Sequence, residues 1–547
     1  MSQNKDGTQA NGSITEKTIA EAEKINHLNF TDAERKQMLE RLNERLGNYE
    51  KLRAIKLDNS VPPALYFDPR PPGTKTHCRN HCTSTIEPIK LSNIPLPPVP
   101  SELEEMAFYP LTHLSMLIRT RKVTSKQLTE MYLRRLKRYD PYLHCVVTLT
   151  EKLALTQAKR ADDEMAQSIY RGPLHGIPWG AKDLLATKGI PTTWGAKPYE
   201  DQVIDTNATV VERLEEAGAV LVAKLSMGAL AQGDVWFKEK TRNPWNLDEG
   251  SSGSSAGAGS AVAAGLVGFA IGTETLGSII SPCKRCGVTG LRPSFGRVSR
   301  YGAMALSWSM DKIGPICRTV EDCAVVFDAI KGPDCRDLTV VNEHFTWDPK
   351  AGLDSLKVGF LEAAFEADEE NKAGNEAVLE TLRNLGLDLI PIELPDYPVL
   401  DMAFLLRVEA AAAFDELTMT GLNELLVSQG DGAWPNTFRA ARFVPAVEYI
   451  QANRIRTLII QEMAELMENV DVYVAPANDR INLTLTNLTG HPTVVVPSGL
   501  SEEGVPNNSV TFTGRLYGEA EALTLAKTYQ ETTEFHLKHP PMEYGSE

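Results

Sequence analysis

Apolar residues follow a helical spacing near the start of the chain, behind a polar stretch over 1–13 that we expect to be a disordered tail. The positions with this spacing are Ile19, Ala22, Ile25, Met38, Leu39, Leu42, Leu46 and Tyr49. Thr31 stands where a second helix needs an N-cap. The pattern predicts a helical hairpin over 14–60 that packs on the rest of the chain; a short partner-binding coiled coil is the alternative.

Prolines are frequent over 61–104, which excludes a helix or a central strand and predicts an extended connector. Soft metal ligands gather inside it at His77, Cys78, His81 and Cys82, and two more stand at Cys283 and Cys286. Their spacing is not that of a standard zinc module. We therefore expect an ordinary loop and no metal, with zinc binding as the alternative.

Helical and strand-like patterns alternate from residue 105 onward. Helices are predicted at 110–119, 124–138, 151–168, 207–217, 400–468 and 518–537, and strands at 176–183, 219–223, 267–271, 357–360, 387–392, 472–475, 493–496 and 509–513. Such alternation over so long a span predicts an α/β fold. We expect a single large domain over 105–540, with a mixed, mostly parallel twisted sheet covered by helices on both faces.

Composition narrows the possible partners. The 547 residues carry a net charge of -16 without a long basic run, which argues against a nucleic-acid partner. No stretch of about 18 apolar residues is present to span a membrane, and the first residues lack the apolar core of a signal peptide. The 8 cysteines are too sparse for a disulfide scaffold and suit a reducing compartment. A cytoplasmic enzyme is the expectation.

The stretch from Gly250 to Arg292 is rich in glycine and serine, yet it contains apolar segments that a flexible linker would not need. Gly253 to Gly257 satisfies G-x-S-x-G, which would make Ser255 a hydrolase nucleophile on a strand-to-helix turn. The preceding residues 243–249 are turn-like, which disfavours that interpretation. A phosphate-binding loop is disfavoured because no complete glycine-rich phosphate motif is present.

A second serine offers a better arrangement. Thr275 to Ser278 follows a predicted strand as a tight turn, which can aim several backbone N–H groups at one oxyanion. A serine hydroxyl needs a base, and Lys182 lies in an otherwise apolar strand where burial would lower its pKa from about 10.4. A serine between the two could pass the proton.

Several motifs in this order resemble the amidase signature family of serine hydrolases. They are His175-Gly-Ile-Pro-Trp-Gly-Ala-Lys182-Asp183, Arg242-Asn-Pro-Trp, Gly253-Ser254-Ser255-Ala256-Gly257, Gly272-Thr-Glu-Thr-Leu-Gly-Ser278, Cys286-Gly-Val-Thr-Gly-Leu-Arg-Pro293, Asp311-Lys-Ile-Gly-Pro315 and Leu488-Thr-Gly-His-Pro492. The likeness covers roughly residues 105–535. It also implies that Cys286 is an ordinary buried cysteine.

The resemblance implies a catalytic triad. Ser278 would be the nucleophile, Ser254 a relay serine that follows a cis peptide bond, and Lys182 the base. The oxyanion hole would be the backbone of Thr275, Leu276, Gly277 and Ser278. The implied reaction is hydrolysis of a small-molecule carboxylic amide, with esters or carbamates as further substrates, through an acyl-enzyme and without a cofactor.

Four departures from the family pattern affect the substrate site. Leu276 replaces a small residue, Glu274 often an aspartate and Ile280 commonly an arginine, while Ser252-Gly253 replaces a double glycine. We expect Gly253, Ser255, Ile280 and Trp308 to contact substrate. The departures disfavour a glutamine-using amidotransferase subunit that delivers ammonia to a partner, but this alternative stays open, as does a non-catalytic paralogue.

The sequence says little about substrate identity. We expect the pocket to involve segments 195–206, 230–240, 300–310 and 400–460. Aromatic residues in the last of these favour an apolar or aromatic group, with ordinary helix core as the alternative: Phe404, Phe414, Trp434, Phe438 and Phe443. A homodimer is left open.

Overall fold

The computed structural model of the protein describes residues 14–57, 64–65 and 89–545. The expected tail over 1–13, much of the proline-rich connector and the ligand cluster from His77 to Cys82 lie outside the described residues. Among the described residues, no helix is long and apolar enough to cross a membrane.

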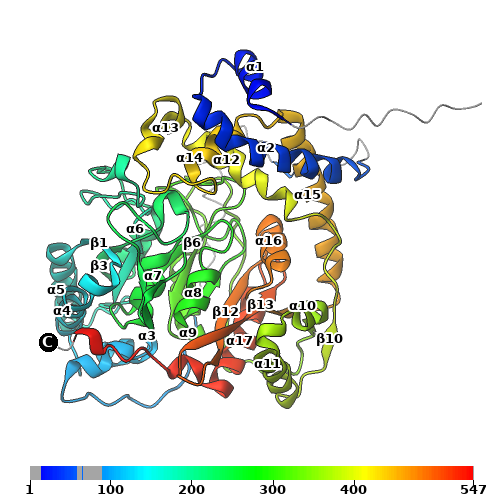
Figure 1. Ribbon diagram of the computed structural model, residues 1–547. Coiled ribbons are helices and arrows are strands. Elements are labelled where there is room, and N and C mark those ends of the chain that lie inside the picture. Colours follow the sequence, from blue (N-terminus) through cyan, green and yellow to red (C-terminus); the bar gives the residue numbers. More distant parts are fainter. Residues whose placement is uncertain (1–13, 58–63, 66–88, 546–547) are drawn as a thin grey trace, which may run out of the picture.

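An eleven-stranded sheet forms the centre of the molecule (Figure 1). In spatial order its strands are β1 (Val146–Leu149), β3 (Val220–Leu225), β2 (Pro178–Lys182), β6 (Phe269–Glu274), β8 (Lys312–Cys317), β7 (Thr289–Arg292), β12 (Thr493–Leu500), β13 (Pro506–Gly514), β11 (Val472–Pro476), β9 (Val358–Phe360) and β10 (Leu389–Pro391). Two further strands, β4 (Arg242–Asn243) and β5 (Asn246–Gly250), form a separate small sheet.

The large sheet is mixed, as the sequence predicts. Parallel pairs fall in two groups, β2 with β3 and β6, and β9 with β10 and β11. The other neighbouring pairs are antiparallel, and they outnumber the parallel ones that we expected to dominate. The β2, β3 and β6 strands are buried along their whole length, which explains their nearly continuous apolar sequences.

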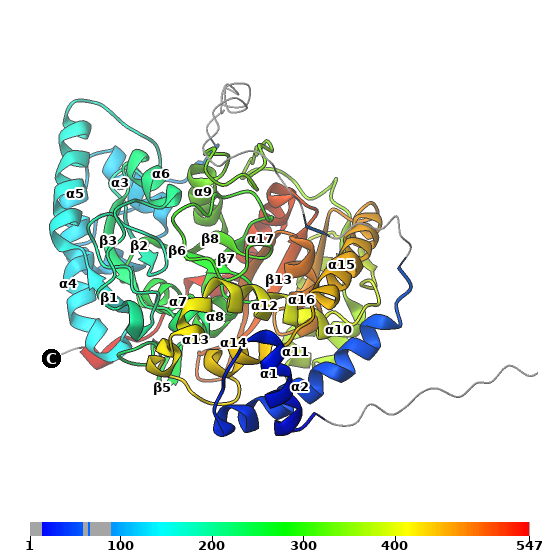
Figure 2. The same ribbon diagram turned by 90° about the horizontal axis from the view of Figure 1, so that it is seen from above.

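Helices cover both faces of the sheet. On one face α9 (Val320–Ile330) and α17 (Glu519–Thr533) contact each other, and on the other α7 (Ala256–Ala263) contacts α8 (Ile280–Cys286) (Figure 2). The remaining helices of this body are α3 (Leu111–Arg119), α4 (Ser125–Leu143), α5 (Glu151–Ala166), α6 (Thr209–Glu216), α10 (Glu362–Ala367), α11 (Lys372–Asn384), α12 (Phe404–Ala413), α13 (Asp415–Met419), α14 (Trp434–Ala441), α15 (Ala446–Leu466) and α16 (Arg480–Thr489).

Two helices precede this body, α1 (Glu16–Asn26) and α2 (Asp32–Arg53). Thr31 caps α2 in a reciprocal capping box with Glu34, and Thr15 caps α1 in the same way. The apolar side of α2 packs against α14 in a small cluster made by Ile19, Met38, Leu42 and Ala440. The pair therefore lies across the helices at the top of Figure 1.

Candidate active site

Lys182 is the last residue of β2, and its side chain is fully buried. Its Nζ lies 2.9 Å from Ser254 Oγ, 3.0 Å from Ser255 Oγ and 2.9 Å from Thr273 Oγ1. Thr273 comes from β6, which pairs in parallel with β2, so the two strands end side by side. The carboxyl ends of parallel strands are a common place for ligand and catalytic sites.

The protonation of Lys182 is set mainly by burial. Burial lowers its pKa from 10.5 to about 7, although the charges of Asp311 and Glu274 favour the ammonium. An amine with this pKa is partly neutral near pH 7, so it has a lone pair with which to accept a proton. Lys182 therefore has the environment of a general base.

Ser254 follows a cis peptide bond from Gly253, at the position that the resemblance implies. Gly253 lies so close to another loop that a Cβ atom there would stand 1.9 Å from the carbonyl oxygen of Gly233, which only glycine avoids. The Ser254 side chain is buried, and its Oγ accepts a hydrogen bond from Lys182. The Ser254 hydroxyl and the Lys182 amine are thus in direct contact.

Ser255 occupies a different environment. Its buried Oγ donates to the carbonyl oxygen of Thr273 and accepts from the N–H of Thr273, both at 3.1 Å. Of residues 243–249, which we expected to be turn-like, residues 246–249 lie in strand β5, but β5 belongs to the separate small sheet. Ser255 is held between Lys182 and Thr273, which is not the exposed position of an elbow nucleophile.

Ser278 lies on the turn between β6 and α8, with 8% of its surface exposed. Its carbonyl oxygen accepts from the N–H of Ser255 at 3.2 Å, which ties this turn to the serine loop. Across the described ranges, neither the Ser278 hydroxyl nor the N–H groups of Leu276, Gly277 and Ser278 form a hydrogen bond within the protein. Unpaired N–H groups on one turn suit a developing oxyanion.

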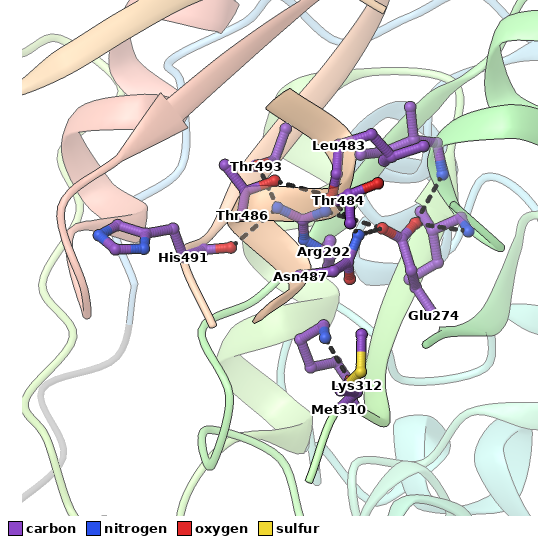
Figure 3. A network of polar contacts seen from close by, with 12 residues as sticks. Glu274, Arg292, Met310, Lys312, Leu483, Thr484, Thr486, Asn487, His491 and Thr493 are labelled. Atoms are coloured by element: carbon purple, nitrogen blue, oxygen red, sulfur yellow. Dashed lines mark hydrogen bonds and ion pairs between the residues drawn. The ribbon is translucent and has the colours of Figure 1, made fainter. Parts of the chain in front are cut away.

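Glu274 holds this turn through hydrogen bonds to the backbone at the start of α8. Its Oε2 accepts from the N–H groups of Ile279 and Ile280 at 2.9 and 3.0 Å, and its Oε1 accepts from Arg292 and Asn487 at 2.8 Å each (Figure 3). Burial acts to raise the pKa of Glu274, but Arg292 and these donors overcome it and hold the pKa at about 2. The carboxylate thus stays charged and fixes the start of α8.

Sequence reasoning noticed Glu274 only as a departure and did not find Arg292 or Asn487. The buried Glu274–Arg292 pair joins β6 to β7, and Asn487 comes from α16, more than two hundred residues later. The sequence signal that could have revealed this pair is a charged residue at the end of each apolar strand. Charged side chains are rarely buried without a partner.

A cavity of about 330 Å³ adjoins the cluster at Thr273 and Thr275. Trp308 lines it, whereas Ser255 and Ile280 are buried and do not line it. Of the four segments expected to form the pocket, 300–310 supplies much of the cavity wall and 230–240 contributes only Ala231. Segments 195–206 and 400–460 contribute no residue to this lining. Leu276 packs on the main core rather than into the cavity.

The aromatic residues of segment 400–460 belong to the protein interior. Phe414 and Trp434 both stack on Phe438, with ring centroids 5.8 and 5.0 Å apart, and Phe404 is buried in the same core. Phe443 packs instead with the cluster beneath α2. The ordinary-core alternative describes their positions, and none of them lines the cavity at Thr273 and Thr275.

In the described part of the chain, no group of three or more His, Cys, Asp or Glu side chains is placed to hold a metal ion. Cys283 and Cys286 are free and buried, which agrees with an ordinary structural role for Cys286. Cys335 is disulfide-bonded, which departs from our expectation of reduced cysteines.

The sequence family described as Amidase matches residues 127–523, which is most of the chain. The chain belongs to the amidase family. One subunit of the glutamyl-tRNA(Gln) amidotransferase from Coxiella burnetii is 32% identical over 481 residues, which cover 79% of this chain and 99% of that relative. The corresponding protein of a Roseiflexus species is 33% identical over 470 residues, covering 77% of this chain and 96% of that relative.

Solved structures agree with this membership of the amidase family. The peptide amidase from Stenotrophomonas maltophilia superimposes with a TM-score of 0.71 at 28% identity, covering 80% of this chain and 99% of the other. A 6-aminohexanoate cyclic dimer hydrolase, at 21% identity and a TM-score of 0.68 over 80% of this chain and 99% of that one, shares the fold. The expected family and the single large α/β domain with a mixed sheet are thereby confirmed.

Proposed function

We propose that this chain hydrolyses a carboxylic amide through a serine acyl-enzyme, with Ser278 as nucleophile, Ser254 as proton relay and Lys182 as base. One observation carries the proposal: a buried Lys182 amine, whose pKa burial lowers to about 7, lies 2.9 Å from Ser254 Oγ. The serine loop is bonded to the Ser278 turn, whose N–H groups face no acceptor among the described residues.

The first half of the reaction forms the acyl-enzyme. The substrate carbonyl oxygen accepts from the N–H groups of the 275–278 turn, and Ser278 Oγ forms a bond to the carbonyl carbon. The Ser278 proton passes to Ser254 Oγ as the Ser254 proton passes to neutral Lys182. The carbon–nitrogen bond then breaks while the ammonium of Lys182 returns a proton, through Ser254, to the leaving nitrogen.

The second half regenerates the enzyme. A water molecule attacks the acyl carbon while its proton passes through Ser254 to Lys182. The bond to Ser278 Oγ breaks, and the Lys182 proton returns to that oxygen through the same relay. The products are ammonia or an amine and a carboxylic acid, which gives up its proton to the amine or to solvent as a carboxylate, and the triad is left in its starting protonation state.

A pair of variants tests this proposal. Ser278→Ala should lower amide hydrolysis at least about a thousandfold and abolish covalent labelling by a fluorophosphonate, because the nucleophile is gone. Ser281→Ala, the same change on α8, is the matched control and should keep both. Residual activity well above a trace in Ser278→Ala, or labelling that moves to Ser255, would sink the assignment.

A second function is favoured by the names of the relatives, which are amidotransferase subunits. An enzyme of that kind would release ammonia from glutamine for a partner. Glutaminase activity of the isolated chain, together with co-purification of a partner, would support it. Fluorophosphonate labelling of Ser278 would exclude a non-catalytic paralogue. The expected cytoplasmic location, the small-molecule substrate and a homodimer remain predictions.

A further inference from the structure

The cavity beside the Ser278 turn has a largely apolar wall. Its apolar lining residues include Leu184, Ala303, Met304, Leu306, Ile313 and Leu338. Its volume of about 330 Å³ falls at the lower end of the range of pockets that enclose small organic ligands. Because Thr273 and Thr275 also line it, the cavity adjoins the first residue of the turn that would bind a carbonyl oxygen.

The charged groups of the same wall already have protein partners. Arg300 pairs with Asp337, the Arg300 Nε lying 3.1 Å from Oδ2, and Arg336 pairs with Glu212 at 3.1 Å. Asp311 accepts from the hydroxyl of Thr275 and from two backbone N–H groups. The charged side chains of Arg300, Arg336 and Asp311 on this wall are therefore already paired with protein groups, which a substrate carboxylate would have to displace or share.

Lys312 also lines the cavity, and its charged neighbours are of both signs. Its buried amine donates to the carbonyl oxygen of Met310 (Figure 3). Burial, with help from Arg292, lowers the pKa of Lys312 well below 10.5 despite the opposing charges of Glu274 and Asp311. Burial thus makes the ammonium of Lys312 less favourable than in water, and its amine already donates to a protein carbonyl.

Aromatic side chains stand where the cavity meets the surface. Trp308 and Tyr301 line it with 51% and 36% of their surfaces exposed, and the Arg336 guanidinium lies 4.3 Å from the centre of the Tyr301 ring. Exposed aromatic faces at a pocket mouth favour contact with another ring.

Taking the proposed amide hydrolysis as given, we propose that this cavity selects uncharged amides with an apolar acyl chain that ends in an aromatic ring, and rejects amides with a free carboxylate. A carboxylate drawn into this apolar, already paired environment would lose its hydration without a compensating partner. L-glutamine and other amides that carry a free carboxylate are consequently poor substrates of this chain.

Binding to the Ser278→Ala variant separates this inference from the chemistry. Calorimetry compares 3-phenylpropanamide, hexanamide and adipic acid monoamide, the last two matched in chain length and differing by a terminal carboxylate. We expect the two neutral amides to bind at least tenfold more tightly than the acidic one. Equal or tighter binding of adipic acid monoamide would overturn the inference, whatever the wild-type chain hydrolyses.

Two further changes in the same background locate the effect in this cavity. Leu338→Lys should raise the affinity for adipic acid monoamide at least fivefold, whereas Ile169→Lys, the same charge on an exposed residue outside the cavity, should not. Trp308→Ala should weaken 3-phenylpropanamide about tenfold while sparing hexanamide. If both lysine variants behave alike, the cavity is not the site of selection.

Turnover in the wild-type chain then tests the proposed function independently. Binding of the neutral amides without their hydrolysis would refute the serine mechanism and leave the cavity assignment standing. Hydrolysis that prefers amides with a free carboxylate would refute the cavity assignment and leave the serine mechanism standing. Hydrolysis of 3-phenylpropanamide with a kcat/KM at least tenfold above that of adipic acid monoamide supports both.

Discussion

The Lys182 amine has hydroxyl groups, not carboxylates, as its hydrogen-bond partners. Ser254, Ser255 and Thr273 each lie about one hydrogen-bond length from its amine, and these neutral groups compensate little of the cost of burying an ammonium. Asp311 and Glu274 act on it only as more distant charges. This balance explains how a lysine is kept near neutrality at the end of a strand.

Activity should follow the neutral form of Lys182. With a pKa of about 7, the neutral fraction falls about tenfold for each pH unit below 7, so kcat/KM should rise with pH through neutrality and level off above it. Lys182→Ala should remove this rise and depress amide hydrolysis more than hydrolysis of the matched ester, whose leaving group needs less help from a proton.

The measurement is a pH–rate profile for an amide and its ester between about pH 5.5 and 9, on both proteins. Lys188→Ala, a change at an exposed lysine six residues later, serves as control and should keep the wild-type profile. A profile that is flat in the wild-type chain, or unchanged in Lys182→Ala, would contradict the assignment of the base.

At the residue scale the sequence predicted part of the site. Lys182 and Ser254 lie 2.9 Å apart, which agrees with the placement that the family resemblance implies. The bonds of Ser255 with Thr273 and of Glu274 with Arg292 and Asn487 were not foreseen. They depend on pairings between distant segments, and local periodicity contains no information about which buried polar groups meet.

At the scale of elements, α2 is joined to α14 by both apolar and polar contacts. Leu42 is buried in the cluster with Met38 and Ala440, and the Arg45 guanidinium donates to the carbonyl oxygen of Ala440 at 2.6 Å. Arg41 of α2 donates to the carbonyl oxygen of Asp431, in the loop before α14. The hairpin thus acts as a brace on that helix.

Leu42→Ala should weaken this brace by about 2–4 kcal/mol, because it removes buried methyl groups at a packed contact. Urea unfolding followed by circular dichroism measures the change, and limited proteolysis within α2 should become faster. Glu44→Ala, at an exposed position on the same helix, should change stability by less than about 0.5 kcal/mol. Equal effects of the two substitutions would show that α2 does not rely on this contact.

Helices and strands with a regular apolar periodicity were predicted well. One short strand in the middle of the sheet and one short buried helix were missed. Helices α4 and α5 and strands β3 and β11 lie where the sequence placed them. Strand β8 was not foreseen, because Gly314 and Pro315 interrupt its pattern, yet it pairs with β6 in the middle of the sheet. Helix α7 is buried on all sides and so has no polar face to reveal its period.

At the scale of the whole molecule, one polar junction connects segments from both halves of the chain. Arg292 of β7 donates to the carbonyl oxygen of His491 and to Thr493 Oγ1 of β12, while it also pairs with Glu274. The His491 ring is buried and shares a hydrogen bond with Thr489 Oγ1. Burial, reinforced by Arg292, lowers the pKa of His491 from 6.5 to about 3.

This histidine should make the fold sensitive to acid. Between pH 6.5 and about 3 the unfolded chain binds a proton at this position that the folded chain does not, so stability must fall as the pH falls, by at most about 1.4 kcal/mol per pH unit. His536, whose pKa is lowered by burial to about 4, adds a change of the same sign. Asp322, whose pKa is raised by burial to about 6, opposes it below that value.

Because these groups overlap, the informative quantity is the difference between two proteins. The free energy of unfolding of His491→Gln should depend less steeply on pH than that of the wild-type chain from pH 6.5 to 4.5, since glutamine does not titrate. His27→Gln, at an exposed position, should keep the wild-type slope. Denaturant titrations at several pH values give both slopes. Parallel curves for His491→Gln and the wild-type chain would mean that the junction does not exclude the proton, and that its acid sensitivity has to come from the carboxylates instead.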